Sequence, residues 1–105
     1  AFLKKYPKSP TADDVQLKMA QSQMAQKRWS KALGMLTQFQ GTYPKSELMP
    51  EALYEMARCF YSLGGCTDAR IILEAIQAKH KDSPFASKAK GLLDEINKNK
   101  SKCSS

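Results

Sequence analysis

The sequence predicts an all-α fold of stacked helical hairpins, a helix-hairpin solenoid, and three observations predict it. A short segment repeats, because Tyr6–Ser9 and Tyr43–Ser46 are identical, His80–Ser83 is related to them, and both intervals are 37 residues. Apolar residues recur at helical spacing, and no stretch alternates apolar and polar residues as a strand would. A single hairpin leaves an apolar face exposed, so neighbouring hairpins are expected to cover one another.

The first unit, residues 10–45, is predicted to hold two helices. The expected packed face of its first helix consists of Ala12, Val15, Met19, Ser22 and Gln23. Ser30 is expected to cap the second helix, because serine side chains satisfy free amides at helix starts. This helix carries Leu33, Leu36 and Phe39 and should end before Pro44, which cannot continue a helix.

The second unit, residues 46–82, shows the same organisation and is followed by a closing helix. Ser46 and Thr67 are expected to cap its two helices, and Gly64–Gly65 should separate them. Their apolar positions are Ala52, Leu53, Met56, Ala57 and Phe60, and then Ala69, Ile72, Leu73 and Ile76. The closing helix, about 84–98, carries Ala86, Ala89, Leu92, Leu93 and Ile96. We therefore expect one repeat domain over residues 1–98 and a polar, disordered tail over 99–105.

Composition places the chain among folded proteins and excludes several classes of function. Apolar residues make up 42% and charged residues 26%, and the longest apolar stretch, Ala32–Leu36, is far shorter than the roughly 18 residues of a membrane span. Lys and Arg number 17 against 10 Asp and Glu, for a net charge of +7. Because the basic residues are dispersed, we favour a solvated basic surface and do not expect nucleic-acid binding.

Catalytic, cofactor-binding and metal-binding sites are not expected, and we predict that the protein is not an enzyme. His80 is the single histidine and falls at a joint where the other units have tyrosine. Asp13–Asp14 falls in the first turn of a helix, where acidic residues favour the positive end of the dipole. The odd number of cysteines fits unpaired thiols, although a local bridge between Cys59 and Cys66 is also open.

The units resemble tetratricopeptide repeats. When Ala69 is placed at the small residue in the middle of the pattern, the earlier positions fall on Leu53, Met56–Ala57 and Phe60. In the first unit the later positions fall on Ala32, Leu36, Phe39 and Pro44. The pattern departs at Gln16 and Gln23, which replace aromatic residues, and at Lys81, which replaces a proline.

The 37-residue period and the Tyr-Pro-Lys-Ser joint narrow the resemblance. They are similar to the C-terminal domain of the bacterial Tol-Pal-associated periplasmic cell-division coordinator family, and outer-membrane assembly lipoproteins have similar units. This resemblance implies a non-catalytic scaffold in the periplasm that serves Tol-Pal, outer-membrane or cell-division machinery. A cytoplasmic repeat adaptor or secretion chaperone is the alternative, and a basic nucleic-acid-binding helical domain is the third.

The first helices of stacked hairpins line a concave face, which is the expected binding surface for a protein or peptide partner. The register predicts a groove for a peptide or helix at Leu17, Gln21, Met24, Tyr54, Arg58 and Tyr61. Aromatic and arginine side chains are enriched at binding hot spots, so Tyr54, Arg58 and Tyr61 are the expected anchors. Residues 1–5 resemble the end of a second helix without its partner, which predicts either further repeats upstream or self-association through the N-terminal face.

Overall fold

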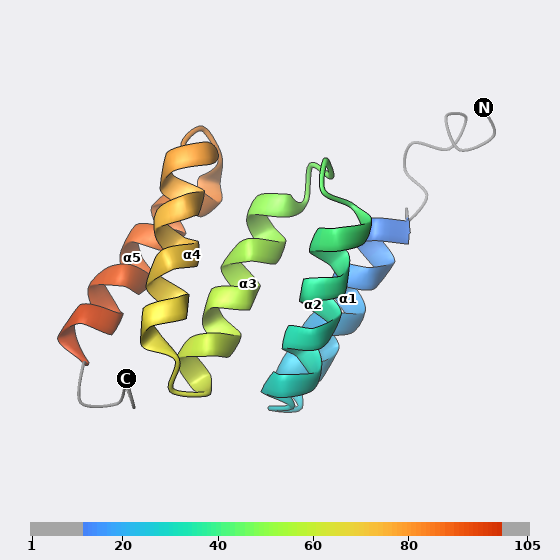
Figure 1. Ribbon diagram of the computed structural model, residues 1–105, viewed down its shortest axis with the longest axis horizontal. Helices are drawn as coiled ribbons and strands as arrows, with labels where there is room; N and C mark the ends of the chain where they lie inside the picture. Colours follow the sequence, from blue (N-terminus) through green and yellow to red (C-terminus); the bar gives the residue numbers. More distant parts are fainter. Residues whose placement is uncertain (1–11, 100–105) are drawn as a thin grey trace.

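The computed structural model describes residues 12–99, and this part of the chain contains five helices (Figure 1). Their bounds are α1 Ala12–Ala25, α2 Trp29–Thr42, α3 Met49–Ser62, α4 Cys66–Lys79 and α5 Pro84–Lys98. Consecutive helices run antiparallel and follow one another along the longest axis of the molecule. The extents along the three principal axes are 50 × 29 × 20 Å. The predicted all-α fold of helical hairpins is confirmed.

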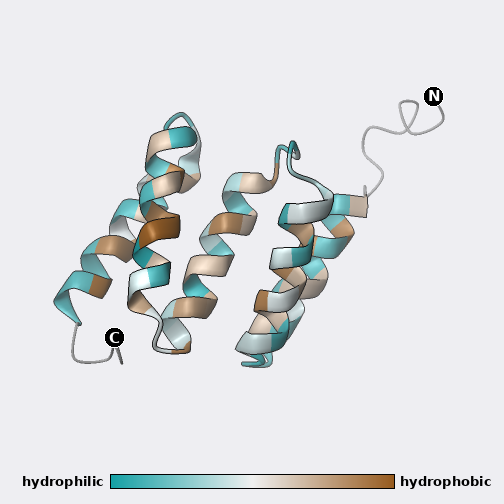
Figure 2. Ribbon diagram, viewed as in Figure 1, coloured by the Kyte–Doolittle hydropathy of each residue, from teal (hydrophilic) through white to brown (hydrophobic). Residues whose placement is uncertain are grey.

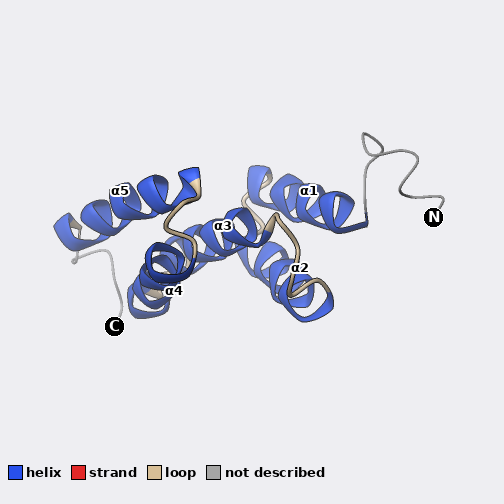
Figure 3. Ribbon diagram, turned by 90° about the horizontal axis from the view of Figure 1, so that it is seen from above, coloured by secondary structure: helices blue, strands red, loops and turns tan. Residues whose placement is uncertain are grey.

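The helices form two layers (Figure 3). Helices α1, α3 and α5 lie on one side, with α3 set back between the other two, and α2 and α4 lie on the opposite side. Each helix packs on the next along the chain, and α3 also contacts α1 and α5. The first helices of the hairpins therefore form the concave side of the array.

The joints between hairpins share one local geometry. Ser46 and Ser83 each accept a hydrogen bond at the side chain from the amide two residues later, at 3.0 and 3.1 Å. Tyr43 and His80 are the C-caps of the preceding helices, and their amides donate to the carbonyls four residues earlier at 2.7 and 2.8 Å. These hydrogen bonds are thus equivalent at two of the three joints, and Ser9 lies outside the described residues. Ser83 is the N-cap of α5, but α3 begins two residues later in its joint and has Leu48 as its N-cap, so the prediction that Ser46 caps α3 is wrong.

The turns inside the hairpins are equivalent too, but their caps differ from those expected. Lys27 and Gly64, 37 residues apart, both have positive φ angles, of 63° and 88°. The residues that follow them, Arg28 and Gly65, are the N-caps of α2 and α4. The prediction that Ser30 and Thr67 cap these helices is wrong, because a left-handed turn residue starts each helix earlier and both side chains fall inside the first turn.

The core runs through the whole array and includes small residues on paired helices. Ala20, Ala32, Ala57 and Ala69 are all fully buried, as the close packing of the paired helices requires. The largest fully buried side chains include Phe39, Leu36, Leu73, Ile76 and Ile96. Figure 2 shows hydrophobic and hydrophilic segments alternating along the helices, as expected for helices with one packed face.

The predicted packed face of α1 is wrong. Val15 and Met19 are 44% and 49% exposed, whereas Leu17, Ala20 and Met24 are buried. The stripe was assigned from spacing alone, but α1 packs against α2 and α3, and these two neighbours cover a different side of the helix. Gln16 points toward α2, because its amide nitrogen donates to the carbonyl oxygen of Met35 at 3.1 Å.

Two expectations concern residues that the structure does not describe. The partial N-terminal helix over residues 1–5 and most of the polar tail, 100–105, lie outside the described residues. Within residues 12–99, no helix has the length and apolar character needed to cross a membrane.

Candidate functional site

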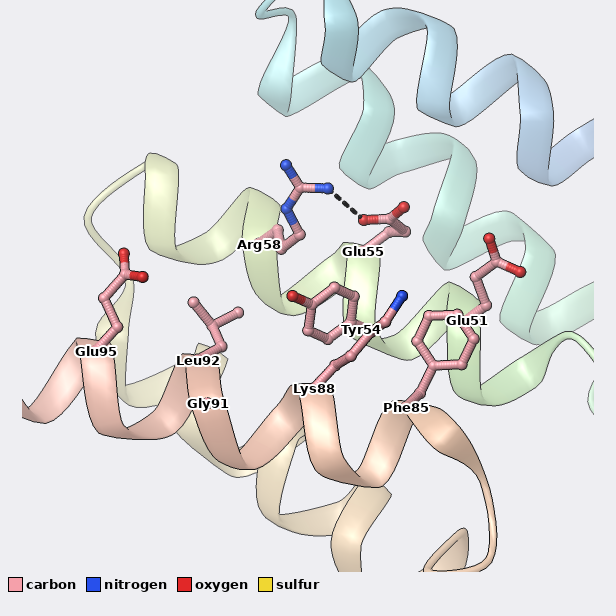
Figure 4. Close-up of a pocket in the computed structure, with 9 residues that line it drawn as sticks. All are labelled: Glu51, Tyr54, Glu55, Arg58, Phe85, Lys88, Gly91, Leu92 and Glu95. Atoms are coloured by element: carbon pink, nitrogen blue, oxygen red, sulfur yellow. Dashed lines mark hydrogen bonds and ion pairs between the residues drawn. The ribbon is translucent and has the colours of Figure 1, made fainter.

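The concave side contains a recess of about 500 Å³ between α3 and α5, which we call the α3–α5 groove (Figure 4). Helix α3 contributes one wall and α5 the other. The lining residues are Glu51, Tyr54, Glu55, Arg58, Phe85, Lys88, Gly91, Leu92 and Glu95. The groove therefore combines aromatic and aliphatic side chains with charged groups of both signs.

The groove is built from equivalent positions of the repeat. Four pairs of lining residues are separated by 37 residues: Glu51 and Lys88, Tyr54 and Gly91, Glu55 and Leu92, and Arg58 and Glu95. At the pair of Tyr54 and Gly91, α3 has a tyrosine side chain where α5 has only a hydrogen atom. A Cβ atom added to Gly91 would meet nothing within 4 Å. The missing side chain at Gly91 is one physical reason for the open space beside Tyr54.

Aromatic rings form the apolar part of the groove. The rings of Tyr54 and Phe85 lie 5.8 Å apart between centroids, tilted by 50°. The Lys88 ammonium nitrogen lies 4.8 Å from the centroid of the Phe85 ring, a cation–π distance. Leu92 extends toward the same space from α5 (Figure 4). These contacts connect α3 to α5 and hold the two rings at the groove.

A polar network fixes the α3 wall. Glu55 is a largely buried carboxylate, and its two oxygens accept hydrogen bonds from Arg58 at 2.9 Å and from Gln21 at 3.0 Å. The Gln21 amide nitrogen also donates to Glu51 at 2.9 Å. Hydrogen bonds to a charged acceptor are the stronger kind, so this network holds α1 and α3 in register.

A second recess of about 220 Å³ adjoins this network between α1 and α3. It is lined by Gln21, Met24, Ala25, Glu55 and Arg58. Glu55 and Arg58 line both recesses, so the ion pair between them separates the two. Together the recesses follow the concave side from α1 to α5.

The structure places the six residues predicted to form the binding surface in three different environments: the α3–α5 groove, the second recess and the core. Tyr54 and Arg58 line the α3–α5 groove, and Gln21 and Met24 line the second recess. Leu17 belongs to the core, with an exposed fraction of 2%, so its assignment to the groove is corrected. Met24 is also largely buried and offers only part of its surface, and Tyr61 packs against the core and is absent from the lining of both recesses.

Several lining residues were not predicted. Phe85 and Glu55 had no predicted role, and Leu92 was expected only as an apolar position of the closing helix. The 37-residue register does indicate the α5 side of the groove. Lys88, Gly91 and Glu95 lie 37 residues after Glu51, Tyr54 and Arg58 of α3. Phe85, the second residue of α5, lies 37 positions after Leu48, which was not a predicted groove position.

The cysteines differ in state. Cys59 is a free, fully buried thiol on α3. Its pKa is raised from 9.0 to about 11, chiefly by burial and also by the Glu55 carboxylate, while Arg58 acts to lower it. Cys66, at the start of α4, is disulfide-bonded. The local bridge between Cys59 and Cys66 that the sequence left open is therefore not formed. No group of three or more potential metal ligands occurs among residues 12–99.

Stacked antiparallel hairpins with a concave first-helix side define the class of helical repeat proteins. Residues 14–46 and 51–83 match the tetratricopeptide repeat family, and these ranges cover nearly all of the two hairpins α1–α2 and α3–α4. The chain therefore belongs to the tetratricopeptide repeat family, and it is a protein–protein interaction module of a typically non-catalytic type. It matches none of the curated proteins and none of the solved structures at a significant level.

Proposed function

We propose that the α3–α5 groove binds a peptide or helix of a partner protein. The single observation that carries this proposal is the recess of about 500 Å³, which is lined by equivalent repeat positions of α3 and α5. It is open at Gly91, which has no side chain to fill it. The groove lies on the concave side, where stacked helical repeats form their extended binding surfaces. It is also large enough for one or two side chains of a bound segment.

The lining describes the partner's chemistry. An apolar side chain fits between Tyr54, Phe85 and Leu92, where it would bury its surface against the aromatic rings. Charged groups of both signs surround this position, so a partner segment with flanking acidic and basic residues can pair with them. We expect the apolar contact to supply most of the affinity and the charges to set the orientation.

The test fills the groove without removing any contact. Gly91→Leu adds a side chain at the open position, and it also removes a helix glycine, which favours the folded state by up to about 1 kcal/mol. We expect this variant to be at least as stable as the parent protein but to lose peptide binding. Peptides would first be selected on the parent protein from a displayed random library and then titrated by fluorescence anisotropy.

Gly34→Leu is the matched control. Gly34 is an exposed helix glycine on α2, in the opposite layer, and a Cβ atom there also meets nothing within 4 Å. It should bind the selected peptides as the parent does. Equal binding of the same peptides by the Gly91→Leu variant would show that they do not occupy the α3–α5 groove.

For the cellular role, we propose a scaffold of the bacterial periplasm that serves Tol-Pal, outer-membrane or cell-division machinery. Two observations support it: the resemblance of the Tyr-Pro-Lys-Ser joints to that periplasmic family, and the disulfide bond at Cys66. Disulfides persist in oxidising compartments and are rare in the cytosol. The alternatives are a cytoplasmic repeat adaptor or secretion chaperone and, third, a nucleic-acid-binding domain.

Thiol trapping in cells separates the compartments. Cells that express the full-length protein would be lysed in acid and alkylated with and without prior reduction. A periplasmic protein should show Cys66 blocked until reduction. If Cys66 reacts without reduction, the cytoplasmic alternative is favoured. Salt-dependent binding to a nonspecific duplex would be the signature of the nucleic-acid alternative.

A further inference from the structure

The charges of the α3–α5 groove are unevenly distributed along its length. Its lining includes three carboxylates and two cationic side chains, and the second recess adds no other charged residue. The lining is therefore net negative, although the chain as a whole has a net charge of +7. The place of the surplus carboxylate decides which charge on a partner the groove favours.

At the start of α3 and α5, charges of opposite sign balance each other. Glu51 accepts a hydrogen bond from Gln21 at 2.9 Å, and the Lys88 ammonium nitrogen lies 4.8 Å from the centroid of the Phe85 ring. Both charged groups thus have a partner within the protein. This end of the groove therefore favours neither sign.

The positive charge of Arg58 is directed out of the groove. Its guanidinium group donates to Glu55 at 2.9 Å, and Figure 4 shows it turned toward this carboxylate and away from α5. Because the two charges lie so close together, they largely cancel at the groove. Neither Arg58 nor Glu55 therefore supplies the surplus charge.

Glu95 is the carboxylate that remains. It is exposed and lies in the last turn of α5, where its side chain extends beside Leu92 (Figure 4). The C-terminal ends of helices favour cations, and α3 has no basic residue in its last turn. Lys98 is the basic residue in the last turn of α5, but it does not line the groove. This end of the groove therefore favours a cation from the partner.

We infer that the groove selects a partner segment with a lysine or arginine near its apolar anchor, and that Glu95 binds this cation. The inference rests on the proposed function of the groove. Glu95 follows Gly91 by four residues, so it lies about 6 Å further along α5. In an extended segment the side chain two positions from the anchor spans this distance on the same face, and in a helical segment the one four positions away does so.

The test uses peptides selected on the parent protein, in matched sets that differ only in the residue at this spacing. Lysine should bind about threefold more tightly than glutamine, and glutamate should bind more weakly than glutamine. Glu95→Gln should reduce the difference between lysine and glutamine to less than about 1.5-fold. Fluorescence anisotropy measures these affinities, and the preference of the parent for lysine should shrink as salt is added.

Asp94→Asn is the matched control. Asp94 is the neighbouring exposed carboxylate of α5 and does not line the groove. Its substitution removes the same charge and should leave the preference for lysine intact. A preference that survives Glu95→Gln, or a parent protein that favours glutamine or glutamate, would overturn the inference and leave the groove proposal standing. If the peptides bind Gly91→Leu as tightly as the parent, the groove proposal fails and the inference fails with it.

Discussion

Helices α1 and α3 hold equivalent places in their hairpins, but they bury different side chains. Met56 is buried on α3 and Met19 is exposed on α1, although the two residues are identical and 37 positions apart. On the concave side the contrast is reversed, because Leu17 is buried while Tyr54 reaches the groove. The comparison teaches that a residue's neighbours in the stack, and not its position in the repeat, decide whether it packs or binds.

The largest expected effect concerns α2 and α4, the second helices of the two hairpins. It tests whether equivalent residues with similar neighbours contribute equally to stability. Leu36 and Leu73 are equivalent, fully buried, and each lies on a helix with neighbours on both sides. Leu36→Ala and Leu73→Ala should therefore lower the free energy of unfolding by similar amounts, about 2–5 kcal/mol each. Urea unfolding measures both. A loss confined to one of them would show that the two hairpins are not equally packed.

A smaller effect separates α1 from α3. Glu55 is the buried acceptor of Gln21 and Arg58, whereas the equivalent residue of α1, Lys18, is exposed. Glu55→Ala should lower the free energy of unfolding by about 1–3 kcal/mol, because it removes the charged acceptor of two hydrogen bonds. Lys18→Ala should change it by less than about 0.5 kcal/mol. Equal effects in thermal unfolding would contradict the assignment of Glu55 as the centre of the network.

The two hairpin turns predict a pair of opposite changes. Both Lys27 and Gly64 have left-handed backbone geometry, which glycine adopts without a steric penalty. Lys27→Gly should raise the free energy of unfolding by up to about 1 kcal/mol, and Gly64→Ala should lower it by about 1 kcal/mol. Calorimetry can measure both shifts. A destabilised Lys27→Gly variant would indicate that the lysine side chain stabilises its turn.

The last comparison is between Cys59 and its equivalent on α1, the exposed Ser22. Ionisation of the Cys59 thiol has no effect on stability at neutral pH and changes it only at alkaline pH. Because burial raises the pKa of the folded thiol from 9.0 to about 11, the unfolded chain ionises first as pH rises. The contribution of this thiol to stability is thus complete below pH 9 and lost as pH rises toward 11. Unfolding of the parent protein should show a steeper alkaline decline than that of Cys59→Ala. Parallel pH profiles for the two proteins would contradict this.

The repeat interval was enough to predict most of the fold. Because local sequence sets the joints, the register at Ser46 and Ser83 correctly placed two equivalent turns and the helices around them. The buried alanines at 32 and 69 follow from the same register. The start of α2 was missed because Lys27 adopts a positive φ angle, which no sequence rule assigns to lysine.

The candidate site was less predictable because it depends on packing between hairpins. Spacing places Leu17 and Tyr54 on one face of their helices, but only the crossing of α1 and α3 shows that Leu17 is covered. The network at Glu55 joins residues 34 positions apart through side chains, and no periodic pattern encodes such a bond. Tyr54 and Arg58 line the recess because they lie where α3 faces α5, and their role in binding stays a prediction.

The absence of a side chain at residue 91 has a consequence for the evolution of specificity. Alanine, valine and leucine at this position would make the recess progressively shallower without disturbing the backbone, since the added atoms meet no neighbour at first. Substitutions at this one position would thereby set how large a side chain of the ligand fits into the recess. Related chains could diverge in what they recognise while their scaffolds remain interchangeable.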